Sequence, residues 1–159
     1  MPTNLYGPGD NYDLQSGHVI AALIRKFYEA TKSNAQSIEV WGSGKPKREF
    51  LSSTDLAEAC VFLMNLVDQK FNSLLQGDSS ENSYPIVNVG AGEDISIKDL
   101  SLLIAKISGF KGDVIFDKTK LDGTPRKLLN VDILTQLGWT ANISISDGIR
   151  QALKDFEHS

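Results

Sequence analysis

The sequence of 159 residues lacks features that disulfide-bonded, zinc-binding, membrane-spanning and nucleic-acid-binding proteins require. It holds one cysteine, Cys60, and two histidines, His18 and His158, so it cannot form an internal disulfide and offers few ligands for zinc. No apolar run approaches the roughly 18 residues of a membrane-spanning helix. Lys and Arg number 16 against 20 Asp and Glu, which argues against a general nucleic-acid surface. We therefore expect no metal, membrane or nucleic-acid partner, and a reducing compartment, the cytoplasm.

The composition is that of a folded domain. Hydrophobic residues make up 41% of the chain and charged residues 23%, values typical of globular proteins. This length suits one domain rather than two, so we expect residues 1–159 to form a single domain. The opening residues 1–8 resemble the end of a strand that runs into a Pro- and Gly-bounded loop, and we expect that a region preceding them has been lost.

Hydrophobic spacing predicts strands that alternate with helices. Helices are expected at residues 18–32, from residue 54 onward, and at 97–108, 131–137 and 147–156; strands are expected at 37–41, 86–89 and 114–116. Ser96 is expected to cap the third helix and Gly109 to end it. Cys60 is assigned, with Leu56 and Leu63, to the buried face of the second helix. The alternation favours an α/β or mixed α+β fold.

Val89-Gly90-Ala91-Gly92 follows a predicted strand and precedes a helix, as a dinucleotide-binding loop does. Ile95 stands where the third glycine of that motif belongs. The segment is therefore predicted to be a strand-to-helix turn, not a phosphate-binding loop.

His18 is a candidate acid. It stands at the predicted start of the first helix, after a polar loop. An exposed imidazole can transfer a proton near neutral pH. A solvated or capping histidine fits the same position, and the residues alone favour that interpretation.

Two polar clusters are candidates for nucleotide binding. Trp41 is followed, after a Gly-Ser-Gly turn, by Lys45, Lys47 and Arg48; further along stand Asp122, Arg126 and Lys127. An aromatic ring can stack on a base, and a guanidinium binds phosphate through two parallel hydrogen bonds. A carboxylate can hold ribose hydroxyls. The alternatives are a buried strand tryptophan beside a solvated loop, and a surface turn.

Seven motifs in fixed order point to one family. They are PTNLYGP at residues 2–8, DN at 10–11, GHVI at 17–20, VWGSG at 40–44, REF at 48–50, NVG at 88–90 and DGTPRK at 122–127. Together they resemble the GDP-L-fucose synthase family of the extended short-chain dehydrogenases/reductases. Residues 6–8 and 48–50 are shared with other sugar-nucleotide epimerases and dehydratases, whereas residues 17–20 and 122–127 favour the fucose branch.

The resemblance implies an NADP-dependent enzyme that epimerises GDP-4-keto-6-deoxy-D-mannose at C3 and C5 and reduces C4. It makes His18 the acid of the epimerisation. It implies contacts to NADP from Pro2, Thr3, Asn4, Leu5 and His18, and contacts to the GDP-sugar from Asn4, Lys26, Trp41, Arg48, Asp122 and Lys127. Lys26 stands where the family often has Arg, and so lacks the bidentate fork. The family's catalytic cysteine has no counterpart here, and Cys60 does not take its role.

The resemblance covers only the C-terminal half of that family. It implies an α/β, mixed α+β substrate-binding portion without the N-terminal Rossmann half, inactive alone and completed by that half in cis or trans. The segments at residues 2–5 and 86–89 are then expected to present an unpaired sheet edge. Assembly into a homo-oligomer is a further possibility that the sequence does not decide. The alternatives are a stand-alone or split-enzyme nucleotide-sugar-binding module, and part of another sugar-nucleotide epimerase or dehydratase.

Overall fold

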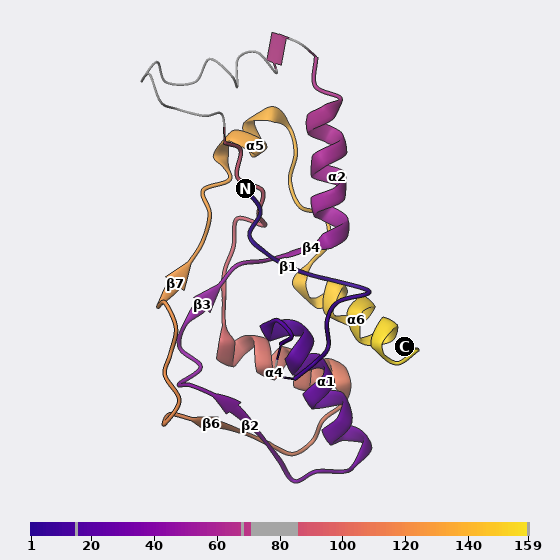
Figure 1. The fold of residues 1–159 in the computed structure, drawn as a ribbon, viewed down its shortest axis with the longest axis vertical. Coiled ribbons are helices and arrows are strands. Elements are labelled where there is room, and N and C mark those ends of the chain that lie inside the picture. The colour runs from indigo at the N-terminus through magenta and orange to yellow at the C-terminus, as the bar shows by residue number, and fades with distance from the viewer. Residues whose placement is uncertain (15, 68, 71–85, 159) are drawn as a thin grey trace.

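The computed structural model describes residues 1–14, 16–67, 69–70 and 86–158. Figure 1 shows an elongated molecule whose two ends are built from different helices. The helices are α1 (Val19–Lys32), α2 (Ser53–Met64), α4 (Ile97–Ser108), α5 (Asp132–Leu137) and α6 (Ile145–Phe156). α2 and α5 form one end, α1 and α4 lie towards the other, and α6 lies between α2 and α1 (Figure 1). The fold is mixed α/β, as the alternation of strands and helices predicted.

The strands of the described residues form small sheets. They are β1 (Asn4–Tyr6), β2 (Ser37–Trp41), β3 (Lys47–Arg48), β4 (Phe50–Ser52), β5 (Ile95–Ser96), β6 (Asp113–Asp117) and β7 (Arg126–Lys127). β1 pairs in parallel with β4, and β2 with β6. β3 lies between β5, which is antiparallel to it, and β7, which is parallel.

The predicted strand at residues 86–89 is reduced to one bridge, in which Val89 pairs with Pro2. The Thr3 N–H donates to the Val89 carbonyl at 3.0 Å. The expectation of an unpaired edge is wrong for residues 2–5, which pair both with Val89 and with β4, and stays a prediction for residues 86–89.

The larger hydrophobic cluster lies where α1 packs against α4 and α6. α1 buries the face that its spacing predicted: Ile20, Leu23, Ile24 and Phe27. The Phe27 ring is fully buried and meets the ring of Phe110 nearly edge-on, with centroids 5.6 Å apart. Burial of each such side chain contributes roughly 1.5–3 kcal/mol, so this face holds α1 in place.

The predicted ends of α4 are confirmed. The Ser96 hydroxyl accepts from the Asp99 N–H at 3.0 Å, and Gly109 ends the helix at φ 73°, in the left-handed region that favours glycine. Ser144 caps α6 in the same way, through the Asp147 N–H at 3.1 Å. The prediction did not include this cap. Because Ser144 caps the helix, α6 begins two residues earlier than predicted.

The assignment of Cys60 to the core is wrong, because its side chain is exposed. α2 is apolar around most of its circumference, so periodicity could not select the buried face. The face turned inward carries Asp55 and Ala59, both fully buried. The Asp55 carboxylate accepts the N–H groups of Asn142 at 3.1 Å and Ile143 at 3.0 Å, which supplies its buried oxygens with partners. Ala59 belongs to the second hydrophobic cluster, with Leu51, Val89, Leu134 and Trp139.

Tyr6 joins β1 to α6. Its side chain is only 3% exposed, and burial, with the charges of Asp55 and Asp147, raises the pKa of its hydroxyl. A Cβ at Gly148 would stand 2.1 Å from the Tyr6 oxygen. Close approach of the tyrosine therefore requires glycine here, in the middle of a helix.

Gly148→Ala is expected to lower the free energy of unfolding by about 1–3 kcal/mol, the usual cost of overpacking. Helix propensity alone predicts the opposite sign, a gain of about 1 kcal/mol. Urea unfolding measures the change, with Gln151→Ala at an exposed position of α6 as the control. A Gly148→Ala chain as stable as the control would contradict the contact with Tyr6.

Candidate functional site

A cavity of about 540 Å³ opens where β1, the start of α1, the β3–β7 pair and the loop after β6 meet. It is lined by Thr3, Asn4, Leu5, His18, Val19, Ile20, Trp41, Gly44, Pro46, Arg48, Phe50, Ile97, Leu121, Asp122 and Gly123. A cavity of this size, mostly apolar with a few polar groups, is typical of small-molecule sites. Of the residues expected to contact NADP or the GDP-sugar, all line it except Pro2, Lys26 and Lys127; the basic residues Lys45, Lys47 and Arg126 do not line it either.

His18 stands immediately before α1 and lines the cavity. Its backbone is extended, at φ −69° and ψ 163°, and its carbonyl accepts from the Ala22 N–H at 2.9 Å. The imidazole makes no capping hydrogen bond, and the residue is exposed. The capping interpretation is therefore wrong, and the ring is accessible from the cavity.

Trp41 is 69% exposed and lines the cavity, so it is not a buried strand tryptophan. β2 alternates, with Ile38 and Val40 turned into the core and Trp41 turned out. The Lys120 ammonium lies 5.5 Å from the centre of the indole ring. The cavity wall thus carries an aromatic ring with a cation beside it.

Arg48 is held by backbone carbonyls rather than by carboxylates. Its Nη1 donates to the Lys47 carbonyl at 2.7 Å and to the Thr124 carbonyl at 2.5 Å. Lys127 is its register partner in the parallel β3–β7 pair and so shares its face of the sheet. Lys127 therefore stands next to a lining residue although it is not one itself.

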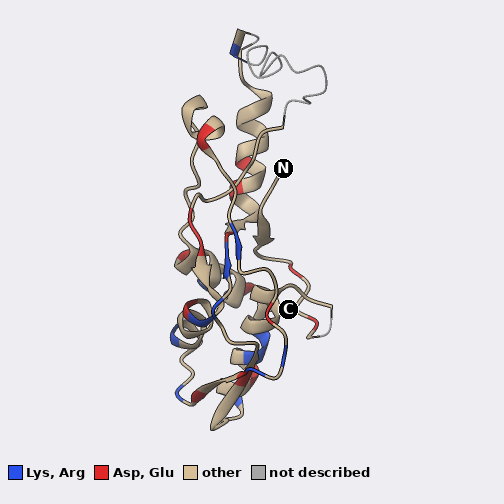
Figure 2. Ribbon diagram, turned by 90° about the vertical axis from the view of Figure 1, so that its left-hand side faces the viewer, with Lys and Arg blue, Asp and Glu red and all other residues tan. Residues whose placement is uncertain are grey.

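The other register pair of these strands is Lys47 and Arg126. Both are paired with Asp94, whose side chain is 6% exposed: the Lys47 Nζ lies 3.8 Å from Oδ1, and the Arg126 Nε donates to Oδ2. Figure 2 shows β3 and β7 as two adjacent blue segments in the middle of the molecule. Asp94 neutralises one face of this basic pair and leaves Arg48 and Lys127 without a carboxylate partner among the ion pairs of the described residues.

Asp122 closes the loop after β6 over the Gly-Ser-Gly turn. Its carboxylate accepts from the Ser43 N–H at 2.8 Å and from the Ser43 hydroxyl at 2.6 Å. These bonds hold the pKa of Asp122 below its ordinary value. A Cβ at Gly42 would stand 2.5 Å from Asp122 Oδ1, so the approach needs glycine there. The ribose contact expected of Asp122 stays a prediction, for which the carboxylate has acceptor capacity left.

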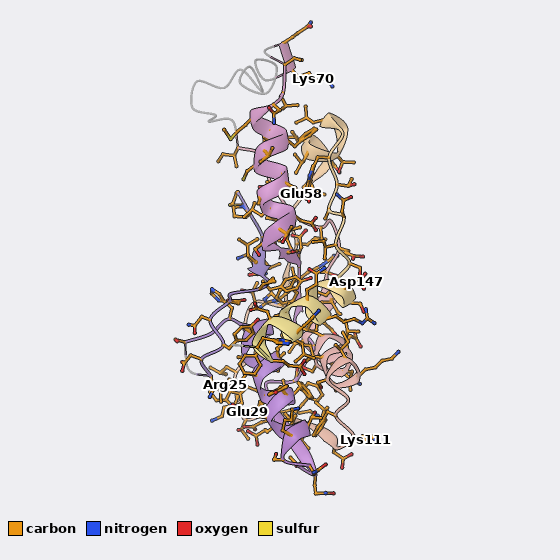
Figure 3. All side chains as sticks on the ribbon, turned by 90° about the vertical axis from the view of Figure 1, so that its right-hand side faces the viewer. Arg25, Glu29, Glu58, Lys70, Lys111 and Asp147 are labelled. Carbon is orange, nitrogen blue, oxygen red and sulfur yellow. The ribbon has the colours of Figure 1, made fainter. Side chains whose placement is uncertain are left out.

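Lys26 and its neighbour Arg25 on α1 do not line the cavity. The Lys26 ammonium donates to the Glu39 carbonyl, and Arg25 pairs with Glu29 through Nε and Oε1 at 2.7 Å (Figure 3). The Arg25 Nη1 also donates to the Tyr12 carbonyl at 3.3 Å, so this half-buried arginine is held by contacts within the protein. The substrate contact expected of Lys26 remains a prediction that needs the side chain to move.

The turn Gly90-Ala91-Gly92 is packed against protein rather than open to a phosphate. The Gly92 N–H donates to Glu49 Oε1 at 2.8 Å, and a Cβ at Gly90 would stand 2.3 Å from the same oxygen. A carboxylate at this position repels phosphate. The prediction of a turn rather than a phosphate-binding loop is confirmed, but the turn follows a single bridge at Val89 instead of a strand and reaches α4 through β5.

Two features of the site were missed from the sequence. Glu49 is fully buried behind the cavity, and the sequence marks it only as part of the REF motif at residues 48–50. Leu121 is 97% exposed yet lines the cavity, opposite in character to the polar loop around it. For Glu49, the available signal was an acidic residue directly before the apolar pair Phe50-Leu51. For Leu121, it was a single leucine in a loop of polar residues.

Within the described ranges, no cluster of three or more His, Cys, Asp or Glu side chains is arranged to hold a metal ion. In the same part of the chain, no helix has the length and apolar content to cross a membrane.

Residues 1–90 match the model of the NAD dependent epimerase/dehydratase family. The chain belongs to this family. It is 47% identical to GDP-L-fucose synthase from Escherichia coli (strain K12) over 159 residues, which is 98% of this chain and 47% of that protein. The resemblance to GDP-L-fucose synthases is thereby confirmed. The chain spans about half the length of the curated relatives that it matches.

Solved structures of about twice the length share this fold. A GDP-6-OMe-4-keto-L-xylo-heptose reductase from Campylobacter jejuni has a TM-score of 0.85 at 30% identity, over 99% of this chain and 52% of that one. A GDP-L-fucose synthetase from Naegleria fowleri bound to NADP has a TM-score of 0.81 at 28% identity, over 99% and 45%. The fold is therefore that of part of an extended short-chain dehydrogenase/reductase.

Ser43→Ala is expected to raise the pKa of Asp122 towards its ordinary value, because one of its two donors is removed. A lowered pKa means that the contact stabilises the loop above the ordinary carboxyl range and is lost as the pH falls through the lowered value. The variant should therefore lose the contact at a higher pH than the parent chain. Carboxyl-carbon NMR titration measures this.

Asp117 is the control for this titration, because Thr119 lowers its pKa in the same way. Its titration should not change in Ser43→Ala. An Asp122 titration that also stays unchanged would show that the Ser43 hydroxyl does not hold the carboxylate.

Proposed function

We propose that this chain is the GDP-sugar-binding portion of a GDP-L-fucose synthase. One observation carries the proposal: residues that are far apart in the sequence, from Thr3 to Asp122, line one cavity in a chain 47% identical to such enzymes. In this proposal the whole enzyme epimerises GDP-4-keto-6-deoxy-D-mannose at C3 and C5 and reduces C4. The single domain of residues 1–159 is its substrate-binding half, and the cytoplasm is its compartment.

The charges around the cavity support an assignment of substrate groups. Trp41 offers an exposed ring on which a purine can stack. Arg48 and Lys127, on one face of the β3–β7 pair, provide the positive charge for a diphosphate. Asp122 accepts from ribose hydroxyls with its remaining lone pairs. Asn4 and His18, from β1 and the start of α1, are left for the sugar.

His18 is proposed as the acid of the epimerisation. After a proton has been removed next to the C4 ketone, the protonated imidazole donates its proton to C3 or C5 of the enolate and becomes neutral. Its exposed ring at the cavity, without a capping bond, is free to do this. Cys60 takes no part, because it lies on α2 and does not line the cavity.

The chain fits only one end of an NADP site. Thr3, Asn4 and Leu5 line the cavity, whereas the N–H of Gly92, in the one glycine-rich turn that resembles a phosphate loop, is bonded to Glu49. When bound, NADPH supplies the hydride that reduces C4. The dinucleotide phosphates must then be held by a companion half, and we propose that the chain alone has no reductase activity.

An exposed apolar face at the end of α2 supports the existence of a companion half. Val61 and Met64 lie one turn apart on α2, and Val67 lies just beyond its end; they are 58%, 85% and 64% exposed. Exposed apolar side chains grouped in this way usually mark a surface that another protein covers. We propose that the second half of the enzyme, in the same polypeptide or a separate one, covers this face.

A second candidate keeps the nucleotide and changes the sugar. The structural match to a GDP-heptose reductase, at a TM-score of 0.85, favours another GDP-4-keto-sugar reductase. Both candidates predict GDP binding. They are separated by the sugar that the completed enzyme turns over.

Arg48→Ala is expected to weaken GDP binding by about 2 kcal/mol, roughly thirtyfold, because the diphosphate loses a charged donor. Calorimetry on the folded chain with GDP and UDP measures it. Lys111→Ala, at an exposed lysine that does not line the cavity and is labelled in Figure 3, is the matched loss of charge and should change nothing. Unchanged GDP affinity in Arg48→Ala, or equal affinity of the parent chain for UDP, would count against the proposal.

His18→Gln is expected to slow solvent-deuterium incorporation at C3 and C5 by roughly a hundredfold in the enzyme completed with a companion half, the usual effect of losing an acid–base group. GDP affinity should change little, because its anchors are Arg48 and Trp41. Mass spectrometry of the sugar measures the exchange. Undiminished exchange would show that His18 is a solvated residue before α1 and not the acid of the epimerisation.

A further inference from the structure

We propose that Glu49 is a positioning residue for the phosphate anchors. It does not line the cavity, but it fixes the register of β7 against β3 and so keeps Arg48 and Lys127 on the same face. The inference rests on the proposed function, which makes these two residues the anchors. It also assigns a role to the one fully buried carboxylate behind the cavity.

The Glu49 carboxylate joins two segments that are distant in the sequence. Oε1 accepts from the Gly92 N–H at 2.8 Å, and Oε2 accepts from the Leu129 N–H at 3.0 Å. The side chain is 0% exposed. It fits only because Gly90 has no side chain, since a Cβ there would stand 2.3 Å from Oε1. Loss of either bond would leave one oxygen of this buried carboxylate without its donor.

The backbone of Glu49 ties two further segments to the same place. Its N–H donates to the Lys127 carbonyl at 3.2 Å. Its carbonyl accepts from the Asn4 side-chain amide at 2.7 Å and from the Thr3 hydroxyl at 3.3 Å. The neighbours of Glu49 in the sequence, Arg48 and Phe50, both line the cavity. Glu49 therefore bonds to two residues that line the cavity, Thr3 and Asn4, and stands between two others in the sequence.

Register matters here because the β3–β7 pair is short. It consists of the pairs Lys47–Arg126 and Arg48–Lys127 alone. A slip of one residue reverses the face of every side chain in a strand and would turn Lys127 away from Arg48. Leu129 lies two residues beyond Lys127, so its bond to Glu49 Oε2 fixes the position of β7 along β3.

Asp55 provides a matched control. It is also 0% exposed, and its two oxygens also accept two backbone N–H groups, those of Asn142 and Ile143. Neither Asp55 nor its two partners line the cavity. A substitution there removes the same kind of interaction without touching the β3–β7 pair.

The experiment compares Glu49→Gln with Asp55→Asn. Each amide keeps one acceptor oxygen but turns an NH₂ group towards a backbone donor, which it cannot satisfy. Calorimetry with GDP and with guanosine is done where urea unfolding shows each chain to be folded. Amide hydrogen exchange at Leu129 reports the register contact without any ligand.

We expect both variants to lose similar stability. Glu49→Gln should also weaken GDP binding about tenfold, the effect of 1.4 kcal/mol, with much less change for guanosine, and should speed exchange at Leu129. In an Arg48→Ala background, Glu49→Gln should have little further effect on GDP. Asp55→Asn should leave both affinities and the Leu129 amide unchanged.

Equal losses for GDP and guanosine, or the same GDP loss in Asp55→Asn, would reduce Glu49 to a structural residue and overturn the inference. A parent chain that does not bind GDP would instead overturn the proposed function, and unchanged exchange at Leu129 would overturn the register role by itself. If Glu49→Gln does not fold, Gly90→Ala displaces the carboxylate without removing it, and the same outcomes decide.

Discussion

Two fully buried carboxylates, Glu49 and Asp55, join segments that the small sheets of this fold do not join, and each needs hydrogen-bond donors because it is buried. The sheets of the described residues are two or three strands wide, and several strands are two residues long. The two carboxylates accept backbone N–H groups outside these sheets. Glu49 accepts from Gly92 and Leu129, and Asp55 accepts from Asn142 and Ile143. Each joins segments that lie far apart in the chain, so the arrangement of the middle of the molecule depends on buried acids as well as on apolar contacts.

Helices with a single apolar stripe could be predicted from the sequence. α1 and α4 begin and end within about two residues of their predicted limits because spacing, Ser96 and Gly109 all act locally. The side of α2 that is buried, and the pairing of residues 2–5 with Val89 and β4, could not be predicted. Both depend on partners more than forty residues away, Asn142 for α2 and Phe50 for β1.

The site was predicted in part, through motifs rather than through periodicity. Thr3, Asn4, His18, Trp41, Arg48 and Asp122 line one cavity. The β1–β4 pairing brings Asn4 to the segment of Arg48, and the β2–β6 pairing with the Ser43–Asp122 bonds brings Trp41 to the loop of Asp122. The sequence alone left Trp41 between a buried and an exposed position, and the alternation of β2 decides for the exposed one. Glu49 could not be recognised, since its importance lies in two N–H donors whose positions only the folded chain defines.

The two tryptophans of the chain lie in opposite surroundings. Trp41 is 69% exposed at the cavity beside Lys120, whereas Trp139 is 7% exposed within the cluster that packs α2 against α5. Indole emission shifts to longer wavelength as water reaches the ring. The intrinsic fluorescence of this chain therefore has a red component that senses occupancy of the cavity and a blue component that senses the integrity of the opposite end.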